Sequence, residues 1–471
     1  MLNKTKVIAT IGPSTMEKDQ LRRLMENGVD VVRLNMSHAN YNFCKDVINK
    51  VDELNNELNL SVATMIDLVG PEVRTGRFLN GRAYFRKGDK IRIYMYELIG
   101  DSTKFSVDYS NLVKEVKFNS ILKVKDGLME FEVIDIKNDC LVCEVLTDGI
   151  LDDCQNVVVD GVKLHLPTLT KKDEDDILFA HKVNADFLAL SYVSSQEEVL
   201  AVNDILIRLK NDHMGIISKI ESEEALDNID EIIRVSDGIM VVRGDLGVAI
   251  PLERIPGVQK KLIHKCHEAG IVSIVATELL SSMERMARPT RAEVSDVANA
   301  VLDGADAVML SGETTIGKFP IETLNMMEKI INSAENDVDY LEFTSKLIDK
   351  HNDITSVLAQ NVCISASKLK CSCIIAPTMS GYTARKMSRY RPPCPIVAVS
   401  PNVDTVKSLQ LHFGVNPVLI DELSSLDRII EESKKIVFKL ISTSPGDRII
   451  ITGGYPFSDV KSTNFMKIEE L

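Results

Sequence analysis

The chain has 471 residues, 45% of them hydrophobic and 26% charged, which is enough for roughly three globular domains without disulfide support. Its formal net charge of −14 argues against nucleic acid as a partner, because phosphate backbones bind to basic surfaces. No apolar run approaches the roughly 18 residues of a membrane span, no signal peptide is visible and the nine cysteines are scattered, so we expect a cytoplasmic protein with reduced thiols and no membrane contact.

Eight short apolar runs alternate with segments that have the pattern of amphipathic helices, as in a parallel α/β fold. In chain order the runs cover residues 6–12, 29–35, 62–68, 186–193, 215–221, 238–245, 271–278 and 306–313. Eight parallel strands with alternating helices predict a (β/α)8 TIM barrel, whose catalytic groups lie at the carboxyl ends of the strands. Polar residues occur at those ends: Thr10, Arg33, Asn35, Asp67, Ser191, Lys219, Glu221, Arg243, Asp245, Thr277, Ser311 and Glu313.

Two segments fall outside the barrel pattern. Residues from about 77 to 159 alternate apolar and polar positions with turn signals, which predicts an inserted antiparallel β-barrel, placed at the catalytic end where it can act as a lid. After about residue 337, runs at 361–370, 371–381, 394–402, 414–420 and 447–456 indicate a second, smaller parallel sheet. We therefore expect a catalytic barrel over 1–74 and 160–337, a β lid domain over 75–159 and a C-terminal α/β regulatory domain over 338–471.

Two acidic residues, Glu221 and Asp245, end adjacent predicted strands, and a pair of carboxylates suits magnesium or manganese. Lys219 precedes Glu221 by two residues and Arg243 precedes Asp245 by two; in a regular strand this spacing places Lys219 and Glu221 on the same face. A metal ion with two cations at one rim can stabilise a phosphoryl group or an oxyanion in a transition state. As an alternative, these residues form only structural ion pairs between barrel strands. That would account for one cation and one acid, but accounts poorly for two of each at strand ends.

A second polar group combines Asn35, Ser37 and Asp67. One carboxylate with neutral oxygens fits a monovalent cation better than magnesium, because only one charge needs compensation. Alternatively, Asp67 only accepts hydrogen bonds from Ser37 and Arg33. The spacing leaves both interpretations open.

The chain resembles the pyruvate kinase family over nearly its whole length. The matching stretches include KVIATIGPST, VVRLNMSHA, GPEVRTG, KDGL, ISKIES, RGDLGVAIP and SGYTARKMSRYRP, and the run from Pro289 to Thr314 is highly specific. The resemblance implies transfer of a phosphoryl group from phosphoenolpyruvate to ADP, giving ATP and the enolate of pyruvate, which is then protonated in the last step of glycolysis. It also implies a homotetramer.

The resemblance assigns roles to individual residues. Glu221 and Asp245 would hold Mg2+ (or Mn2+), and Asn35, Ser37, Asp67 and the carbonyl of Leu68 would hold K+, with Glu72 as the residue type paired with potassium dependence. Lys219 and Arg33 would contact the phosphoryl group, Gly244 and Asp245 the substrate, and Thr277 would lie where the enolate is protonated. Arg74, His38, Thr10 and Pro13 would lie along the nucleotide.

Several positions depart from the family pattern. Leu68-Val69 stands where the family usually has Thr-Lys, Glu278 where glutamine is usual, and Cys154-Gln155 where a basic pair is expected. Asp126 is kept, but Lys125 replaces the preceding aspartate. Apart from Lys125, each change weakens attraction for anions, so we expect weaker binding of nucleotide or phosphoenolpyruvate with the chemistry retained.

The stretch TMSGYTARK places hydroxyl groups and a glycine before a helix, and helix N-termini bind phosphate. By resemblance, Thr378, Ser380, Gly381 and Thr383 would bind an allosteric sugar phosphate or a nucleotide. A helix cap formed by Ser380 or Thr383 is the structural alternative. The companion loop keeps Gly454 and Pro456 but has Ser458 and Lys461 where glycines are common, so the effector stays open.

Two other functions compete with phosphoryl transfer. A magnesium-dependent barrel aldolase or lyase acting on oxo-acids would share the metal pair and the enolate chemistry. A non-catalytic paralogue that binds metabolites would account for the departures at Val69, Gln155 and Glu278.

Overall fold

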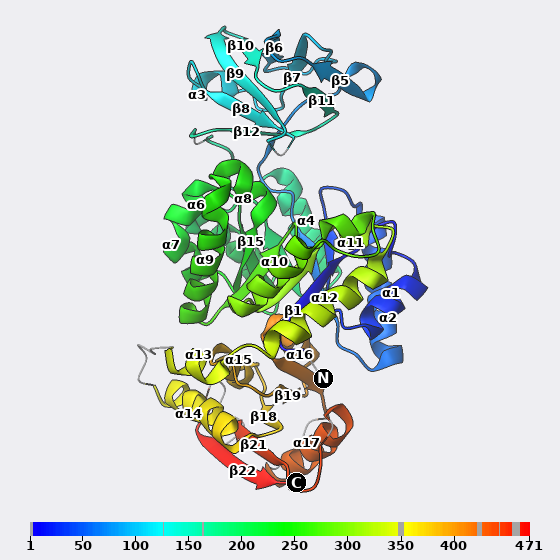
Figure 1. Ribbon diagram of the computed structural model, residues 1–471, viewed down its shortest axis with the longest axis vertical. Coiled ribbons are helices and arrows are strands. Elements are labelled where there is room, and N and C mark those ends of the chain that lie inside the picture. The colour runs from blue at the N-terminus through cyan, green and yellow to red at the C-terminus, as the bar shows by residue number, and fades with distance from the viewer. Residues whose placement is uncertain are drawn as a thin grey trace.

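The computed structural model describes residues 3–125, 127–162, 164–346, 353–421, 426–441, 443–454 and 462–471. Three bodies are stacked along its long axis: the inserted β module, the barrel and the C-terminal domain (Figure 1). The expectations for Asp126, Pro456, Ser458 and Lys461 fall outside the described residues. Within the described ranges, no helix is both long and apolar enough to cross a bilayer.

All eight apolar runs form strands of one closed parallel barrel, which confirms the predicted fold. The order around the barrel is β1-β17-β16-β15-β14-β13-β3-β2. The strands are β1 (Lys6–Thr10), β2 (Val31–Asn35), β3 (Ala63–Asp67), β13 (Phe187–Leu190), β14 (Gly215–Ile220), β15 (Gly238–Val242), β16 (Val272–Ala276) and β17 (Ala307–Leu310).

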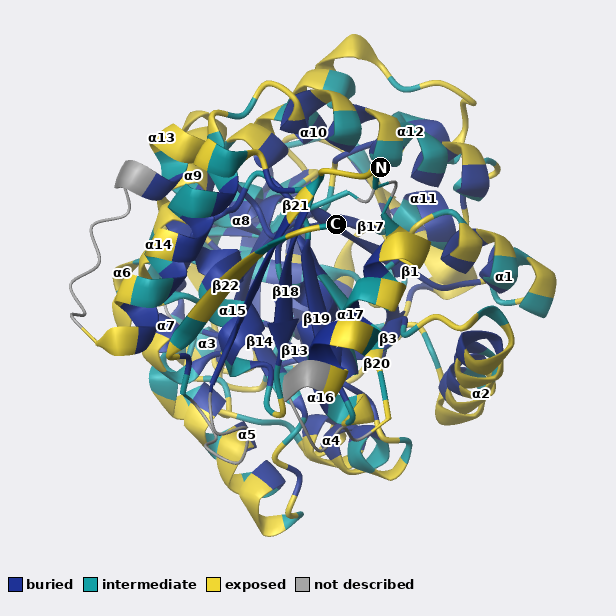
Figure 2. Cartoon of the chain, turned by 90° about the horizontal axis from the view of Figure 1, so that it is seen from below, coloured by how far each residue is buried: buried dark blue, intermediate teal, exposed yellow. Residues whose placement is uncertain are grey.

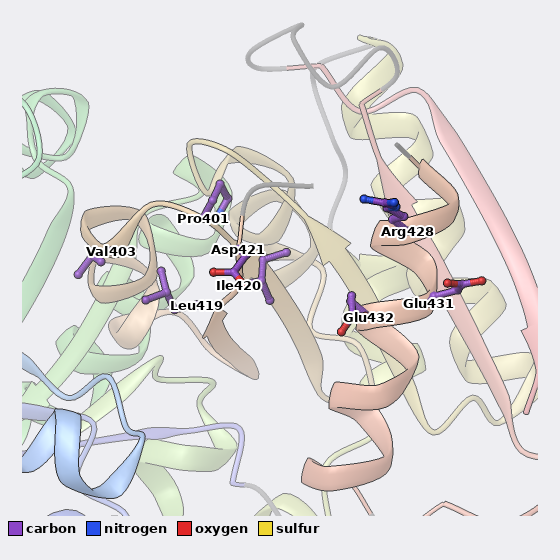
Figure 3. A pocket seen from close by; sticks show the side chains of 8 residues that line it. All are labelled: Pro401, Val403, Leu419, Ile420, Asp421, Arg428, Glu431 and Glu432. Carbon is purple, nitrogen blue, oxygen red and sulfur yellow. The ribbon is translucent and has the colours of Figure 1, made fainter. Parts of the chain in front are cut away.

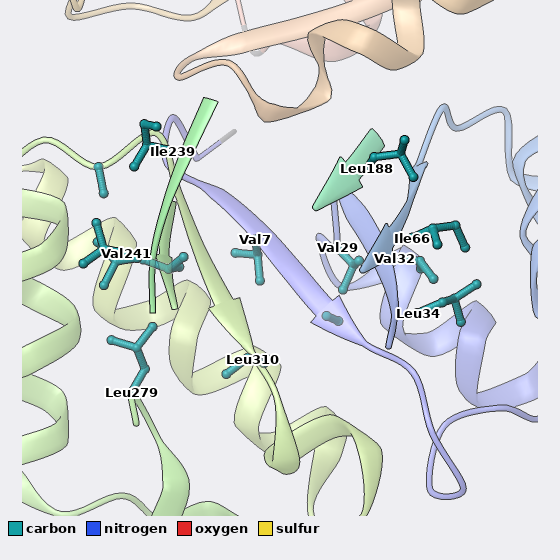
Figure 4. Packing of buried hydrophobic residues seen from close by; sticks show 14 of the residues in the cluster. Val7, Val29, Val32, Leu34, Ile66, Leu188, Ile239, Val241, Leu279 and Leu310 are labelled. Carbon is teal, nitrogen blue, oxygen red and sulfur yellow. The ribbon is translucent and has the colours of Figure 1, made fainter. Parts of the chain in front are cut away.

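Alternating strand residues build two apolar layers. Ile8, Val31 and Met65 pack inside the barrel, while Val7 and Val32 face the surrounding helices (Figure 4). Because both faces of each strand are buried, the strands are continuous apolar runs rather than alternating ones. The same property made them recognisable in the sequence.

Several of the outer helices begin at capping signals. The outer helices are α1 (Lys18–Glu26), α2 (Tyr41–Leu58), α4 (Lys171–Lys182), α5 (Gln196–Arg208), α6 (Glu223–Asp227), α7 (Ile229–Val235), α9 (Ile255–Ala269), α10 (Arg291–Leu302) and α12 (Pro320–Glu335). Thr170, Ser195 and Thr290 each form a capping box at the start of α4, α5 and α10. The reciprocal bonds satisfy N–H groups that have no partner within a helix, and so fix where each helix leaves the strand before it.

Four aspartates tie the strands together at the end opposite the predicted site. Each precedes a strand and accepts a backbone N–H at the start of the neighbouring strand: Asp30 from Val7, Asp186 from Thr64, Asp237 from Ile216 and Asp306 from Ser273, at 2.8, 2.7, 2.8 and 2.9 Å. The eight strands are thereby joined in four pairs, and four carboxylates are gathered at this end of the barrel.

The inserted module has its own apolar core. Its strands are β4 (Val73–Arg74), β5 (Arg82–Phe85), β6 (Lys90–Tyr94), β7 (Lys104–Ser106), β8 (Ile121–Val124), β9 (Met129–Ile136), β10 (Cys140–Val145), β11 (Gly149–Asp152) and β12 (Asn156–Val159). They form a seven-stranded sheet, β4-β12-β8-β9-β10-β6-β7, and the pair β11-β5, packed around one cluster that includes Phe85, Phe105 and Phe131. The pairing is antiparallel as expected, except that β6 and β7 are parallel.

The C-terminal domain contains a five-stranded sheet of order β20-β19-β18-β21-β22. Its strands are β18 (Cys373–Pro377), β19 (Ile396–Ser400), β20 (Val415–Leu419), β21 (Arg448–Gly453) and the antiparallel edge strand β22 (Phe465–Glu470), and its helices are α13 (Tyr340–Lys346), α14 (Ile354–Leu369), α15 (Tyr382–Arg389), α16 (Val403–Ser408) and α17 (Leu426–Leu440). The prediction of a strand over 361–370 is wrong, because this run lies in α14, where Val362, Cys363 and Ala366 form one buried helical face.

The C-terminal domain closes the end of the barrel that carries the four aspartates. Leu411 belongs to the apolar cluster inside the barrel, and an Arg391 nitrogen lies 2.9 Å from Asp306. Lys407 lies 3.9 Å from Asp186, and Arg389 donates to two carbonyls at the end of α9. Seen from this side, buried strands fill the centre and exposed residues surround them (Figure 2).

Candidate active site

Lys219, at the end of β14, is buried among three oxygen-bearing side chains. Its Nζ lies 2.6 Å from Oγ of Ser191, 3.1 Å from Glu221 and 3.3 Å from Asp67. Burial lowers the pKa of Lys219, but the charges of Asp67 and Glu221 outweigh it and raise the pKa to about 12. The side chain is therefore an ammonium ion at neutral pH, held at the barrel mouth.

Arg33 and Asp67 form a second buried pair on β2 and β3. Arg33 Nε donates to Asp67 Oδ2 at 2.6 Å, and Nη1 donates to Thr10 Oγ1 at 2.9 Å. Burial by itself raises the pKa of Asp67, but the Arg33 and Lys219 charges hold it below its usual range. Asp67 is an ionised carboxylate between two cations.

The proposed potassium ligands are brought together on neighbouring strands. Asn35 and Asp67 are register partners, and the carbonyl of Leu68 accepts a hydrogen bond from Ser191 Oγ at 2.7 Å. Ser37 does not bond to Asp67, which corrects that alternative: its N–H bonds to Asn35 Oδ1 at 3.0 Å and the residue is exposed. The gathered donors, one carboxylate with amide and carbonyl oxygens, fit a monovalent cation.

Glu221 directly follows β14, and Asp245 lies three residues after the end of the adjacent strand β15. Glu221 Oε2 accepts the Tyr192 N–H at 2.6 Å, and Asp245 lies in the first turn of α8 (Arg243–Ala249). Among the described residues, no group of three His, Cys, Asp or Glu side chains is arranged to hold a metal. A two-carboxylate site fits magnesium, which keeps several waters and binds substrate oxygens.

Arg243 does not face the predicted phosphoryl site. β15 ends at Val242 and α8 begins at Arg243, so residues 243 and 245 do not share a strand face. The guanidinium is buried, 2.7 Å from both oxygens of Asp296, and donates to the carbonyl of Thr277 at 2.6 Å. The expectation of a second rim cation here is wrong.

Thr277 is held in the left-handed region, with φ of 66°. Its Oγ1 accepts the Gly244 N–H at 2.9 Å and donates to the carbonyl of Ala276 at 2.6 Å. A β-branched residue rarely adopts this backbone conformation, so the three contacts, including that from Arg243, are what maintain it. Thr277 and Gly244 are thus adjacent.

A cleft separates the barrel from the inserted module. Glu72, Tyr192, Glu221 and Asp245 line a cavity of about 140 Å3, together with apolar residues of β12 and the segment that follows it. Arg74 bonds to Glu72 and, at 2.9 Å, to the carbonyl of Cys154. Burial raises the pKa of Glu72, and Arg74 offsets this in part.

No sequence pattern assigned a role to Tyr192, although it lines this cleft. Its hydroxyl lies 3.5 Å from Glu72 and its backbone is left-handed, with φ of 57°. The only local signal was its position after Ser191, at the end of the fourth apolar run.

The residues expected from sequence motifs to bind the nucleotide lie farther apart from one another than the residues around Lys219. Thr10 is buried beneath Arg33, whereas Pro13 and His38 are exposed in the loops after β1 and β2. Thr10 is the last residue of β1, and Pro13 and His38 follow the ends of β1 and β2, so all three lie on the side of the barrel that carries Lys219.

Comparison with known protein families shows which family the chain belongs to. A model of the barrel domain of pyruvate kinase matches residues 2–324, and a model of its alpha/beta domain matches residues 356–469. The chain belongs to the pyruvate kinase family. Its activity is that of a pyruvate kinase, a transferase of glycolysis, and the aldolase or lyase alternative is set aside.

Individual pyruvate kinases are similar over the full length. The protein from Clostridium perfringens is 40% identical over all of both chains, and that from Clostridium acetobutylicum is 38% identical over 99% of each. The crystal structure of a pyruvate kinase from Cryptosporidium parvum superposes with a TM-score of 0.92 at 35% identity, covering 100% of this chain and 96% of that one.

The departures of this pyruvate kinase from the family pattern are structurally mild. Val69 is half-buried and packs against the barrel core, and the Gln155 side chain donates to the carbonyl of Asp153 at 3.0 Å. Lys125 lies 2.7 Å from Asp152 of its own module, which pairs its charge. Glu278 is exposed.

The loop of this pyruvate kinase that is expected to bind an effector joins β18 to α15. The N-cap residue of α15 is Gly381, with φ of 76°, and no side chain caps the helix, so the interpretation of Ser380 or Thr383 as a cap is wrong. Thr383 Oγ1 instead lies 2.9 Å from Thr463 Oγ1, and the Ser380 carbonyl accepts from Arg385 at 2.8 Å. Thr378 is half-buried.

A larger cavity lies elsewhere in the C-terminal domain. It measures about 860 Å3 between the ends of β19 and β20 and helix α17 (Figure 3). Its charged lining is one arginine, Arg428, with the three carboxylates of Asp421, Glu431 and Glu432. The residues of the predicted effector loop are not among those that line it, and its acidic lining disfavours anions.

Proposed function

We propose that this chain transfers the phosphoryl group of phosphoenolpyruvate to ADP, giving pyruvate and ATP, with Mg2+ (or Mn2+) and K+ as cofactors. The single observation that carries this is the environment of Lys219. Its pKa of about 12 keeps the ammonium charged, and its position between Asp67 and Glu221 fixes it at the barrel mouth. Phosphoryl transfer needs positioned positive charge more than covalent catalysis.

In this proposal, each residue of the site has a role that follows from its position. Lys219 and Arg33 stabilise negative charge on the phosphoryl group in flight, and the buried Asp67 keeps both cations in place. Glu221 and Asp245 would hold the divalent cation, which when bound neutralises charge on substrate oxygens. Thr277, with its hydroxyl fixed against the Gly244 N–H, orients the water or hydroxyl that protonates the enolate.

The nucleotide lies, in this proposal, along Arg74, His38, Thr10 and Pro13, beneath the inserted module. The module then acts as a lid that excludes water during transfer. We propose the domain boundaries given above: the barrel carries the catalytic residues, the inserted module covers them and the C-terminal domain regulates. We also propose a cytoplasmic homotetramer, which sedimentation at several protein concentrations would test.

The potassium requirement gives the most direct test of this function. We expect pyruvate to form only when both phosphoenolpyruvate and ADP are present. Replacing K+ by tetramethylammonium at constant ionic strength should lower the rate at least about tenfold, the effect of about 1.4 kcal/mol of lost transition-state stabilisation. Pyruvate release without ADP would contradict the kinase assignment, no pyruvate at all would favour a non-catalytic paralogue, and equal rates in the two salts would contradict the potassium site.

Regulation is proposed at the loop that contains Thr378, Ser380, Gly381 and Thr383. Its support is the glycine-started helix α15, whose first N–H groups have no side-chain cap. Titration of sugar bisphosphates and AMP should shift the half-saturating phosphoenolpyruvate concentration about fivefold or more, a common size for allosteric coupling. Unphosphorylated sugars serve as controls, and no response to any phosphate compound would remove the proposal.

A further inference from the structure

One side chain of the inserted module contacts the barrel away from the hinge where β4 and β12 pair. Lys123, on β8, donates from Nζ to the carbonyl of Val248 at 2.9 Å. Val248 lies in the last turn of α8, where helix carbonyls lack intrahelical partners and carry partial negative charge. A lysine ammonium is well suited to satisfy such a carbonyl.

The turn after β8 faces the same residue. A Cβ placed on Gly127 would lie 3.7 Å from both methyl groups of Val248, an ordinary van der Waals distance. The module and the end of α8 are therefore in close approach at two neighbouring points, one polar and one apolar.

Helix α8 also carries part of the candidate active site. Its first turn holds Asp245 and the Gly244 N–H that binds Thr277, while its last turn accepts the bond from Lys123. Val158 of β12, the register partner of Lys123 on the neighbouring strand, lines the cavity together with Glu221 and Asp245. A short, single helix thus connects the position of the module to the position of the proposed metal ligand.

We propose that Lys123 is a positioning residue that holds the inserted module closed over the active-site cleft by binding the C-terminal end of α8. The proposal rests on the proposed phosphoryl transfer for its kinetic consequence. The closed arrangement excludes water and keeps α8 in place, so the contact stabilises enzyme with both substrates bound. A second, longer contact of Lys123 is with Asp160, which follows β12, at 3.5 Å.

The test compares Lys123→Met with Lys123→Arg in the full-length enzyme. We expect Lys123→Met to raise the KM values for phosphoenolpyruvate and ADP about three- to tenfold, in the range of one hydrogen bond to a charged group, while kcat stays within about twofold. Small-angle X-ray scattering without substrates should show a larger radius of gyration. Lys123→Arg keeps a cationic donor and should restore both readouts toward wild type.

Two further variants test whether the effect of Lys123→Met comes from the lost bond to Val248 or from the loss of a positive charge in general. Lys114→Met removes an exposed lysine of the same module, whose ammonium bonds to Asn111, and should behave as wild type. Asp160→Asn removes the charge at the second contact of Lys123; if it reproduces the Lys123→Met effect, the bond to Val248 is not the cause and the proposal is wrong. Unchanged KM values and scattering in Lys123→Met would also overturn it. Because the scattering measurement requires no turnover, it tests the contact between Lys123 and Val248 even if the enzyme makes no pyruvate.

Discussion

Replacing Lys219 by methionine is expected to lower kcat about 100- to 1,000-fold, the usual effect of removing one preorganised group that stabilises transition-state charge. The ammonium is buried and lies within 3.3 Å of Ser191, Glu221 and Asp67, so no mobile side chain can take its place. Methionine keeps most of the volume and loses only the charge and the donors. Pyruvate formation at saturating phosphoenolpyruvate and ADP measures the effect.

The same substitution at the exposed Lys45 of α2 provides the control, with kcat expected to stay at the wild-type value. Thermal unfolding of both variants shows whether any loss arises from the fold, because Lys219→Met leaves Asp67 and Glu221 with one less cation. A folded Lys219→Met enzyme with nearly full kcat would show that the charge at the barrel mouth does not act on the phosphoryl group.

Replacing Arg391 by methionine is expected to destabilise the protein by about 3–5 kcal/mol, because it leaves a buried carboxylate without its partner. Arg391 is 2% exposed and Asp306 4%, and the guanidinium lies 2.9 Å from Asp306 and 3.0 Å from the carbonyl of Gly304. It also lies over the ring of Phe413, 4.2 Å from the centroid. Urea unfolding followed by circular dichroism measures the change.

Arg234→Met on α7 is the matched control, since it removes an exposed arginine 3.8 Å from Glu231. Exposed ion pairs contribute about 0–1 kcal/mol, so its unfolding curve should nearly coincide with that of the wild type. Equal losses in the two variants would show that the contact between Arg391 and Asp306 contributes no more than a surface pair.

Much of the barrel could be predicted because its strands are buried on both faces. Runs such as residues 238–245 combine an apolar stretch with polar residues at the carboxyl end, and the barrel geometry places those ends together. The contacts of Lys219 with Glu221 and of Arg33 with Asp67 follow from spacing and register of this kind. The prediction failed where the chain changes conformation at a strand end.

Arg243 illustrates that failure, because the strand ends at Val242, three residues before the end of the predicted run, and α8 begins at Arg243. The run 361–370 failed for a different reason: its apolar positions satisfy a helical period as well as a strand. The contacts of Tyr192 with Glu72 and of Lys123 with Val248 join residues 120 and 125 positions apart, and no local pattern encodes such pairs.

The four aspartates that pair the strands have a consequence for how the chain folds. Two of these carboxylates, Asp186 and Asp306, have cations from beyond residue 337 near them, and Leu411 from the same region fills the barrel interior. A fragment ending at residue 337 would retain the residues of the candidate active site. The opposite end of its barrel, however, would be uncovered, and the carboxylates of Asp186 and Asp306 would lack the cations of the C-terminal domain. The two domains therefore gain their stability jointly, and the boundary between them marks a division of architecture, not of folding autonomy.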